Sequence, residues 1–179
     1  MINNGIPLEN LVIFASGSGS NAEKIFEYFK DSTEVLITHI FSNNPEAGVI
    51  SRAERLAIPC TIFTRAEYKD GTLLKKIQSL NTDWVILAGF LWLIPSDFIQ
   101  AYPQRIVNLH PALLPKFGGK GMYGHFVHEA VVEAGEKESG ITIHFVNEHY
   151  DEGGIIFQSS FAVDPSDTPE DVAKKGQVL

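Results

Sequence analysis

Asn108 and His110 lie two residues apart, at the end of a short apolar segment and directly before Pro111. In a β-strand, residues two apart project from the same side, so the amide and the imidazole are predicted to point together. An amide can donate a hydrogen bond to a developing oxyanion, and an imidazole titrates near neutral pH. The pair favours a site where a carbonyl is polarised while a proton moves. The alternative is a purely structural polar pair at a strand end.

An acidic, glycine-rich turn at residues 147–154 supplies a third candidate, Asp151. Its carboxylate would hold His110 and raise the pKa of the imidazole through its opposite charge. The competing interpretation is a solvated turn residue, because Asp-Glu-Gly-Gly is typical of turns. The chain has no Gly-x-Ser-x-Gly sequence, and its single cysteine, Cys60, begins a predicted strand. Attack on a carbonyl is therefore expected from the amine of a bound substrate or from water.

A glycine-rich turn follows the apolar segment at residues 11–15 and precedes a helical pattern. It consists of Gly17, Ser18, Gly19, Ser20 and Asn21. Strand, glycine turn and helix is the arrangement in which backbone N–H groups bind phosphate. The turn loosely matches a dinucleotide fingerprint, but the next predicted strand ends in Ser42-Asn43-Asn44, without the acidic residue that binds a ribose hydroxyl. A phosphorylated sugar is therefore favoured over NAD, and a turn that binds nothing is the alternative.

A metal site is the competing interpretation of the histidines. His110, His144 and Asp151 would form a set of two histidines and one carboxylate, and His125 with His128 an H-x-x-H pair. The spacing includes neither H-E-x-x-H nor the paired cysteines of zinc sites. The sequence therefore favours a site without a metal. The H-x-x-H pair is interpreted as a helix start with one polar face.

The order of the elements predicts an α/β fold. Strands are expected at residues 11–15, 35–41, 60–63, 84–88, 106–107, 141–146 and 155–158, the last with a possible extension to Val163. Helices are expected at 22–29, 47–56, 68–80, 125–134 and from Thr168 onward. This order predicts an open, mainly parallel twisted sheet with helices on both faces. Ligands collect at the carboxyl ends of such strands. The unusually apolar loop at residues 89–95 lies at one of these ends, and it either plugs the core or lines a pocket for a flat ligand.

Composition limits the kind of protein. A length of 179 residues fits a single domain, 1–179. The net charge of −8 is scattered along the chain, which argues against a nucleic-acid surface. No apolar run approaches the roughly 20 residues of a membrane helix, and residues 1–5 lack the pattern of a secretory signal. With one cysteine, a reducing, cytoplasmic setting is expected.

Six motifs carry a family resemblance: residues 16–21 (SGSGSN), 41–43 (FSN), 87–90 (LAGF), 108–116 (NLHPALLPK), 140–146 (GITIHFV) and 151–154 (DEGG). With these motifs the chain resembles the phosphoribosylglycinamide formyltransferase family, folate-dependent enzymes of purine synthesis, over nearly its whole length. The resemblance implies the formyltransferase fold, a Rossmann-like α/β arrangement.

The resemblance also implies an activity, transfer of the formyl group of 10-formyltetrahydrofolate to the amine of 5′-phosphoribosylglycinamide. Asn108, His110 and Asp151 would be catalytic, the glycine turn would bind the phosphate, and His144 would support the site. The residues implied for folate binding are Arg65, Leu91, Trp92, Leu93, Ile94, Asn108, Asn147 and Tyr150. The folate is implied as co-substrate without a metal, the implied partners are these two small molecules, and a homodimer is compatible with them.

The chain departs from the family pattern at a few places. Trp92 stands where many members have Arg, the loop at residues 118–124 is longer than in some, and the C-terminal helix is expected to be cut short. A formyltetrahydrofolate hydrolase would use the same three residues with water, but that family carries an extra N-terminal regulatory domain. A methionyl-tRNA formyltransferase would need a C-terminal RNA-binding domain. Outside the enzymes, the alternative is a non-catalytic binder of phosphorylated sugars.

Overall fold

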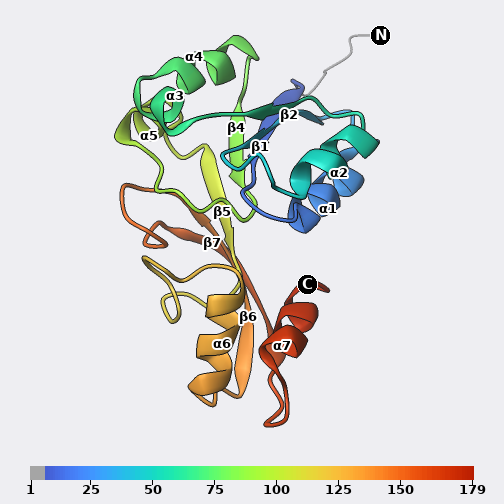
Figure 1. Cartoon of the computed structure of the whole chain (residues 1–179), viewed down its shortest axis with the longest axis vertical. Coiled ribbons are helices and arrows are strands. Elements are labelled where there is room, and N and C mark those ends of the chain that lie inside the picture. Colours follow the sequence, from blue (N-terminus) through green and yellow to red (C-terminus); the bar gives the residue numbers. More distant parts are fainter. Residues whose placement is uncertain (1–6) are drawn as a thin grey trace. The chain divides into compact units, whose positions relative to one another are not determined.

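The structure is a computed structural model in which residues 7–179 are described (Figure 1). Residues 1–5, where the sequence lacks the pattern of a secretory signal, lie outside the described residues. The chain divides into two compact units, the first ending at Phe90 and the second spanning Leu91–Leu179. Across residues 7–179, none of the helices has the length and apolar character needed to cross a membrane.

A parallel sheet forms the centre of the first unit, with strand order β3-β2-β1-β4. Its strands are β1 (Glu9–Phe14), β2 (Val35–Ser42), β3 (Cys60–Ile62) and β4 (Trp84–Leu87). The last four residues of β1 are buried, as expected for a continuously apolar strand that is covered on both faces. The strands predicted in this half of the sequence are thus confirmed.

Helices cover both faces of this sheet (Figure 1). They are α1 (Ser20–Phe29), α2 (Val49–Arg55), α3 (Arg65–Lys69) and α4 (Thr72–Ser79). Ile13 of β1 packs with Ala22 of α1 and with Val49 of α2 in one apolar cluster. Phe14, the next residue, points to the opposite face, where its ring lies 5.7 Å from that of Phe63, which contacts Tyr68 of α3 at 5.5 Å.

The single helix predicted at residues 68–80 is wrong, because two helices, α3 and α4, occupy this segment. A capping box between Thr64 and Glu67 begins α3 before the apolar pattern indicates a helix. Gly71 then adopts a left-handed conformation with φ of 81°, and Asp70 Oδ1 accepts a hydrogen bond from the Thr72 N–H at 2.9 Å. The turn chemistry at Asp70 and Gly71 therefore overrides the helical period.

The second unit contains an antiparallel sheet with strand order β5-β6-β7. The helices and strands of this unit are α5 (Ser96–Ala101), β5 (Ile106–His110), α6 (His125–Glu133), β6 (Glu138–Phe145), β7 (Ile155–Ala162) and α7 (Pro169–Gly176). The register places Asn108 opposite His144 and His110 opposite Thr142. The sequence patterns did not predict α5. The predicted start of α7 is confirmed by a capping box between Thr168 and Asp171.

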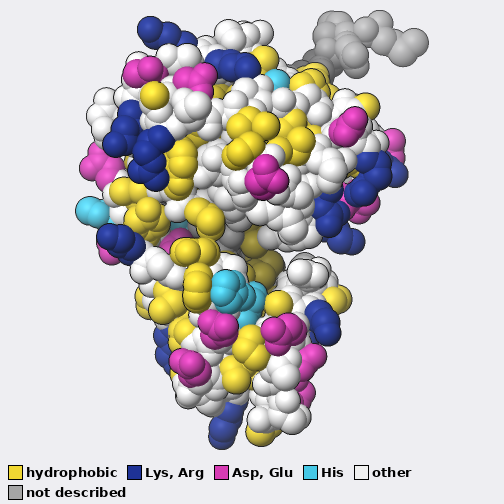
Figure 2. Space-filling model, viewed as in Figure 1, with side chains coloured by type: hydrophobic (Ala, Val, Ile, Leu, Met, Phe, Trp, Pro, Cys, Tyr) yellow, Lys and Arg dark blue, Asp and Glu magenta, His cyan; other side chains and the backbone are white. Residues whose placement is uncertain are grey.

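The predicted α/β class with a mainly parallel sheet is confirmed, since the strand pairings of the first unit are parallel, whereas β5, β6 and β7 pair in antiparallel fashion. On the face drawn in Figure 2, Lys and Arg side chains are interspersed with Asp and Glu side chains.

Candidate active site

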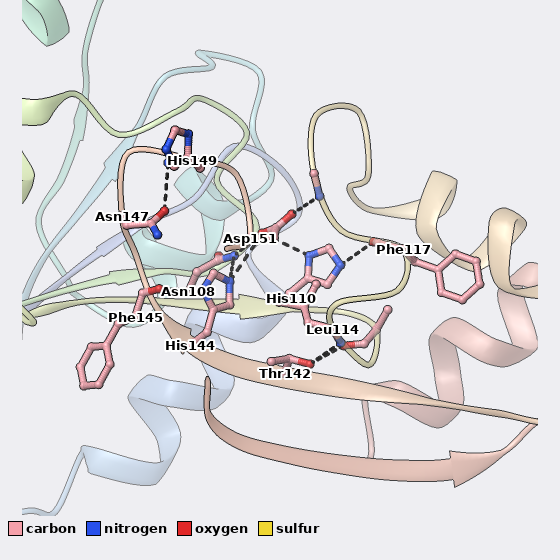
Figure 3. A network of polar contacts seen from close by, with 12 residues as sticks. Asn108, His110, Leu114, Phe117, Thr142, His144, Phe145, Asn147, His149 and Asp151 are labelled. Carbon is pink, nitrogen blue, oxygen red and sulfur yellow. Dashed lines mark hydrogen bonds and ion pairs between the residues drawn. The ribbon is translucent and has the colours of Figure 1, made fainter. Parts of the chain in front are cut away.

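Asn108, His110 and Asp151 converge in the second unit (Figure 3). The strand β5 carries the first two, and the turn between β6 and β7 carries Asp151. Asn108 Nδ2 donates a hydrogen bond to Asp151 Oδ1 at 3.3 Å, and His110 Nδ1 lies 3.5 Å from the same oxygen. The Asp151 side chain is only 10% exposed. It is therefore not a solvated turn residue.

His144 joins this group from β6, directly opposite Asn108. Its Nδ1 lies 2.8 Å from the carbonyl oxygen of Phe145, which can only accept, so Nδ1 carries a proton. In the neutral ring the Nε2 lone pair accepts a hydrogen bond from Asn108 Nδ2 at 3.0 Å. The Asn108 amide thus donates to both His144 and Asp151. Donation to an oxyanion, as predicted, requires one of these hydrogen bonds to be exchanged.

The buried imidazole of His110 lies between two acceptors. Nε2 is 2.8 Å from the carbonyl oxygen of Phe117 and must donate to it, so the neutral ring carries its lone pair on Nδ1, facing Asp151. Burial lowers the pKa of His110 below its ordinary value, although the charge of Asp151 and the Phe117 carbonyl oppose this. The neutral ring is therefore favoured around pH 7, with Nδ1 placed to take up a proton beside a carboxylate.

Asp151 is also bound by the loop that follows β5. Its Oδ2 accepts a hydrogen bond from the Gly119 N–H at 2.9 Å. Burial raises the pKa of Asp151, but the rings of His144 and His110, when they carry a proton toward the carboxylate, and the Gly119 amide outweigh it, so that the pKa lies below its ordinary value. Asp151 is consequently ionised at neutral pH, and its negative charge lies beside His110.

Three loop residues that the sequence analysis did not assign contact the site: Phe117, Gly118 and Gly119. A Cβ on Gly118 would lie 2.6 Å from Leu114 Cδ2 and 3.2 Å from Asp151 Cβ, so a side chain does not fit there without a shift. Phe117 and Asp151 both adopt left-handed backbone conformations, with φ of 55° and 57°. The sequence signal here is four glycines in the seven residues 118–124, a composition typical of a flexible loop that does not by itself predict these contacts.

The predicted phosphate turn, Gly17 to Asn21, lies in the first unit between β1 and α1. Gly19 occupies the N-cap position, and Ser20 begins α1. The turn is held by α2, because the Val49 N–H donates to the Gly17 carbonyl at 3.1 Å and Arg52 Nε donates to the Ser18 carbonyl at 2.8 Å. The sequence analysis did not identify Arg52. The backbone of the turn is thus fixed at a helix N-terminus, as an anion site requires.

We expect Gly19→Ala to destabilise the protein strongly. Gly19 has φ of 78°, and an added Cβ would lie 2.5 Å from Val49 Cγ2 and 2.7 Å from Val49 Cα. Gly71→Ala is the matched control, because Gly71 has φ of 81° at a helix N-cap but nothing within 4 Å of an added Cβ. The free energy of unfolding of the control should fall only by about 1–2 kcal/mol, the cost of a left-handed conformation for alanine. Denaturant unfolding would measure both, and equal losses would contradict the predicted clash with Val49.

The apolar loop after β4 is buried in part and exposed in part. Ile94 is 3% exposed and belongs to the core, whereas Leu91 and Leu93 are each 40% exposed. Trp92 between them is half-buried. One residue of the loop is therefore buried in the core while its neighbours are partly exposed, and a role for the loop in lining a ligand pocket stays a prediction.

The remaining residues implied for folate lie on different elements. Asn147 and Tyr150 belong to the turn between β6 and β7, where Asn147 Oδ1 accepts a hydrogen bond from the His149 N–H at 2.9 Å. Arg65 is the first residue of α3, in the first unit. Their part in folate binding stays a prediction.

The histidines are not arranged as a metal centre in the described chain. Within residues 7–179, no group of three or more His, Cys, Asp and Glu residues could hold a metal ion. The Asn108 amide is within hydrogen-bond distance of both His144 Nε2 and Asp151 Oδ1. His125 opens α6 and is exposed, and His128 follows one turn later, half-buried, so the predicted helix start is confirmed.

A formyl transferase family model matches residues 9–179. The chain belongs to the formyl transferase family. Within it, the chain is similar to phosphoribosylglycinamide formyltransferases. It is 45% identical over 174 residues to the chloroplastic enzyme of Arabidopsis thaliana, covering 93% of this chain and 60% of that one. It is 33% identical to the Bacillus subtilis enzyme, covering 94% and 87%.

The chain spans only 60% and 55% of the length of the plant relatives from Arabidopsis thaliana and Vigna unguiculata. Solved structures of the same kind share its fold. Glycinamide ribonucleotide transformylase 1 from Symbiobacterium toebii has a TM-score of 0.87 at 30% identity, covering 96% of this chain and 81% of that one. The phosphoribosylglycinamide formyltransferase from Brucella melitensis has a TM-score of 0.85 at 34% identity, covering 96% and 88%. The family resemblance found in the sequence is thus confirmed.

Proposed function

We propose that this chain transfers the formyl group of 10-formyltetrahydrofolate to the amine of 5′-phosphoribosylglycinamide. The observation that carries the proposal is the convergence of an amide, a buried imidazole and an ionised carboxylate, Asn108, His110 and Asp151, within 3.5 Å in a member of the formyl transferase family. None of these side chains is an activated nucleophile, so the substrate's own amine makes the attack. Catalysis then consists of positioning, carbonyl polarisation and proton transfer.

In this mechanism the substrate amine forms a C–N bond to the formyl carbon, and the carbonyl oxygen becomes an oxyanion. Asn108 donates to that oxygen after exchanging one of its present hydrogen bonds. His110 accepts the amine proton at Nδ1, where the resulting cation pairs with Asp151. The proton then passes to the folate nitrogen as its bond to the formyl carbon breaks. The neutral state of His110 and the ionised state of Asp151 both suit these roles.

Two binding regions complete the proposal. The turn Gly17–Asn21 binds the substrate phosphate through backbone N–H groups at the start of α1. The folate pterin contacts the backbone of residues 91–94 and the turn that contains Asn147 and Tyr150, with Arg65 contacting the folate as well. His144 supports the site by accepting the Asn108 hydrogen bond. No metal takes part.

The test is to incubate the protein with 10-formyltetrahydrofolate, with and without glycinamide ribonucleotide. A transferase deformylates the folate only when the amine is present. A hydrolase of the same family would deformylate it equally without the amine. A phosphosugar binder would show no turnover in either case, and His110→Ala would leave its ligand affinity unchanged. Turnover that is independent of the amine would overturn the proposed function.

We expect folate binding to quench the fluorescence of Trp92, because its loop presents the apolar residues proposed to contact the pterin. The sequence contains two tryptophans, and the other, Trp84, donates to Glu9 Oε2 in the first unit. A titration with folate should therefore quench the wild type, whereas Trp92→Phe, which keeps Trp84, should show little change. Equal quenching in both proteins would contradict the placement of the pterin at residues 91–94.

We also propose a cytoplasmic location, although the two plant relatives are named chloroplastic. The proposed partners are the two small molecules rather than nucleic acid or membrane, and a homodimer stays a prediction. Sedimentation analysis of the purified chain would measure its oligomeric state.

A further inference from the structure

The buried hydroxyl of Thr142 on β6 makes three hydrogen bonds beside the site (Figure 3). It is 0% exposed and lies opposite His110 in the strand register. Its hydroxyl donates to the Ala112 carbonyl at 2.6 Å and accepts from the Leu114 N–H at 3.0 Å and from Gln158 Nε2 at 2.9 Å. A hydroxyl has one donor and two acceptor positions, so every one of them is used.

These bonds fix the segment that links His110 to its other hydrogen-bond partner. Ala112 and Leu114 lie between His110 and Phe117 in the chain. Gln158 of β7 adds a second bond by donating to the Leu114 carbonyl at 3.0 Å. The segment then returns so that the Phe117 carbonyl accepts from His110 Nε2 at 2.8 Å. The Thr142 hydroxyl and the His110 ring are thus connected through one short stretch of backbone.

We propose that Thr142 is a positioning residue that holds the Phe117 carbonyl on His110 Nε2 and thereby determines which ring nitrogen carries the proton. While Phe117 accepts from Nε2, the lone pair of neutral His110 is on Nδ1, facing Asp151. Without that acceptor, Asp151 is the stronger partner and draws the proton to Nδ1. The consequence for catalysis rests on the proposed function, in which Nδ1 is the base.

Three other titratable groups lie near His110, and none of them is replaced when Thr142 is changed. They are Asp151 in the turn after β6, His144 on β6 and His128 on α6. The hydrogen bond to the Phe117 carbonyl favours the protonated ring and raises its pKa. Loss of this bond should therefore lower the pKa of His110 further, in addition to moving the proton in the neutral ring.

The test compares Thr142→Val, which keeps the shape but removes the hydroxyl, with Thr142→Ser, which keeps the hydroxyl. In Thr142→Val, ¹⁵N NMR of the free protein should show His110 shifting from the Nε2–H to the Nδ1–H tautomer, with a lower titration midpoint. Turnover should fall by about ten- to a hundredfold, the scale of a misplaced catalytic group. Thr142→Ser should keep the wild-type tautomer, titration midpoint and turnover.

A folded Thr142→Val protein that keeps the wild-type tautomer and midpoint overturns the proposal, even if it is less stable. If Thr142→Val does not fold, Gln158→Met removes one hydrogen bond to the Thr142 hydroxyl and one to the Leu114 carbonyl. Gln158 is exposed, and Ser160→Ala is its exposed control on β7. Gln158→Met should shift His110 in the same direction, and an unchanged spectrum overturns the proposal. Because NMR reads the free protein, failure of formyl transfer would leave this result standing and remove only the proposed function.

Discussion

Asp151→Asn is expected to lower turnover for formyl transfer by about a hundredfold or more, the scale of a lost acid–base partner. An amide is nearly the same size but carries no charge, so the cation formed at His110 Nδ1 would lose its counter-charge. The measurement is kcat with both substrates saturating. Glu152→Gln, an exposed neighbour in the same turn, is the matched control and should retain activity. A rate near that of the wild type in Asp151→Asn would count heavily against the proposed function.

The same substitution should move the pH profile. Asp151 raises the pKa of His110, so its removal lowers that pKa, and the acid limb of kcat/KM should shift to lower pH.

Asp151→Asn should also change how the free energy of unfolding depends on pH. Because the folded-state pKa of Asp151 is depressed, its contribution is present above the unfolded value of about 3.9 and is lost as pH falls through the folded value. Asp151→Asn should therefore flatten the loss of stability in acid.

Asn108→Ala is expected to reduce kcat by about a hundredfold or more, the scale of a lost oxyanion donor. The substitution also removes the donor that lies between His144 Nε2 and Asp151 Oδ1, leaving a lone pair beside a carboxylate. The effect should appear in kcat, and KM for the phosphorylated substrate should change little, since the phosphate turn is on another element. Thermal unfolding of the same variant would separate this loss from misfolding. A folded variant with nearly normal kcat would show that Asn108 does not polarise the formyl group.

Local order was predictable from the sequence because it depends on neighbours in the chain. The apolar segments at β1 and β4 predict buried strands, and the glycine turn before α1 predicts a tight backbone at a helix start. The two-residue spacing of Asn108 and His110 predicts that they share a side of β5, because side chains alternate along a strand. At Gly71 a turn interrupts the segment where the apolar periodicity predicts one continuous helix, so the periodicity was wrong there.

The sequence by itself determined the residue types, their local spacing and, through its motifs, the family. Only the tertiary structure decided which distant groups meet. The Asp151 carboxylate reaches the Asn108 amide across 43 residues, and the register of β5 against β6 sets Thr142 opposite His110. The Phe117 carbonyl binds His110 because the intervening backbone is held by side chains from two other strands. Such contacts depend on strand register and loop closure, which no local pattern of residues encodes.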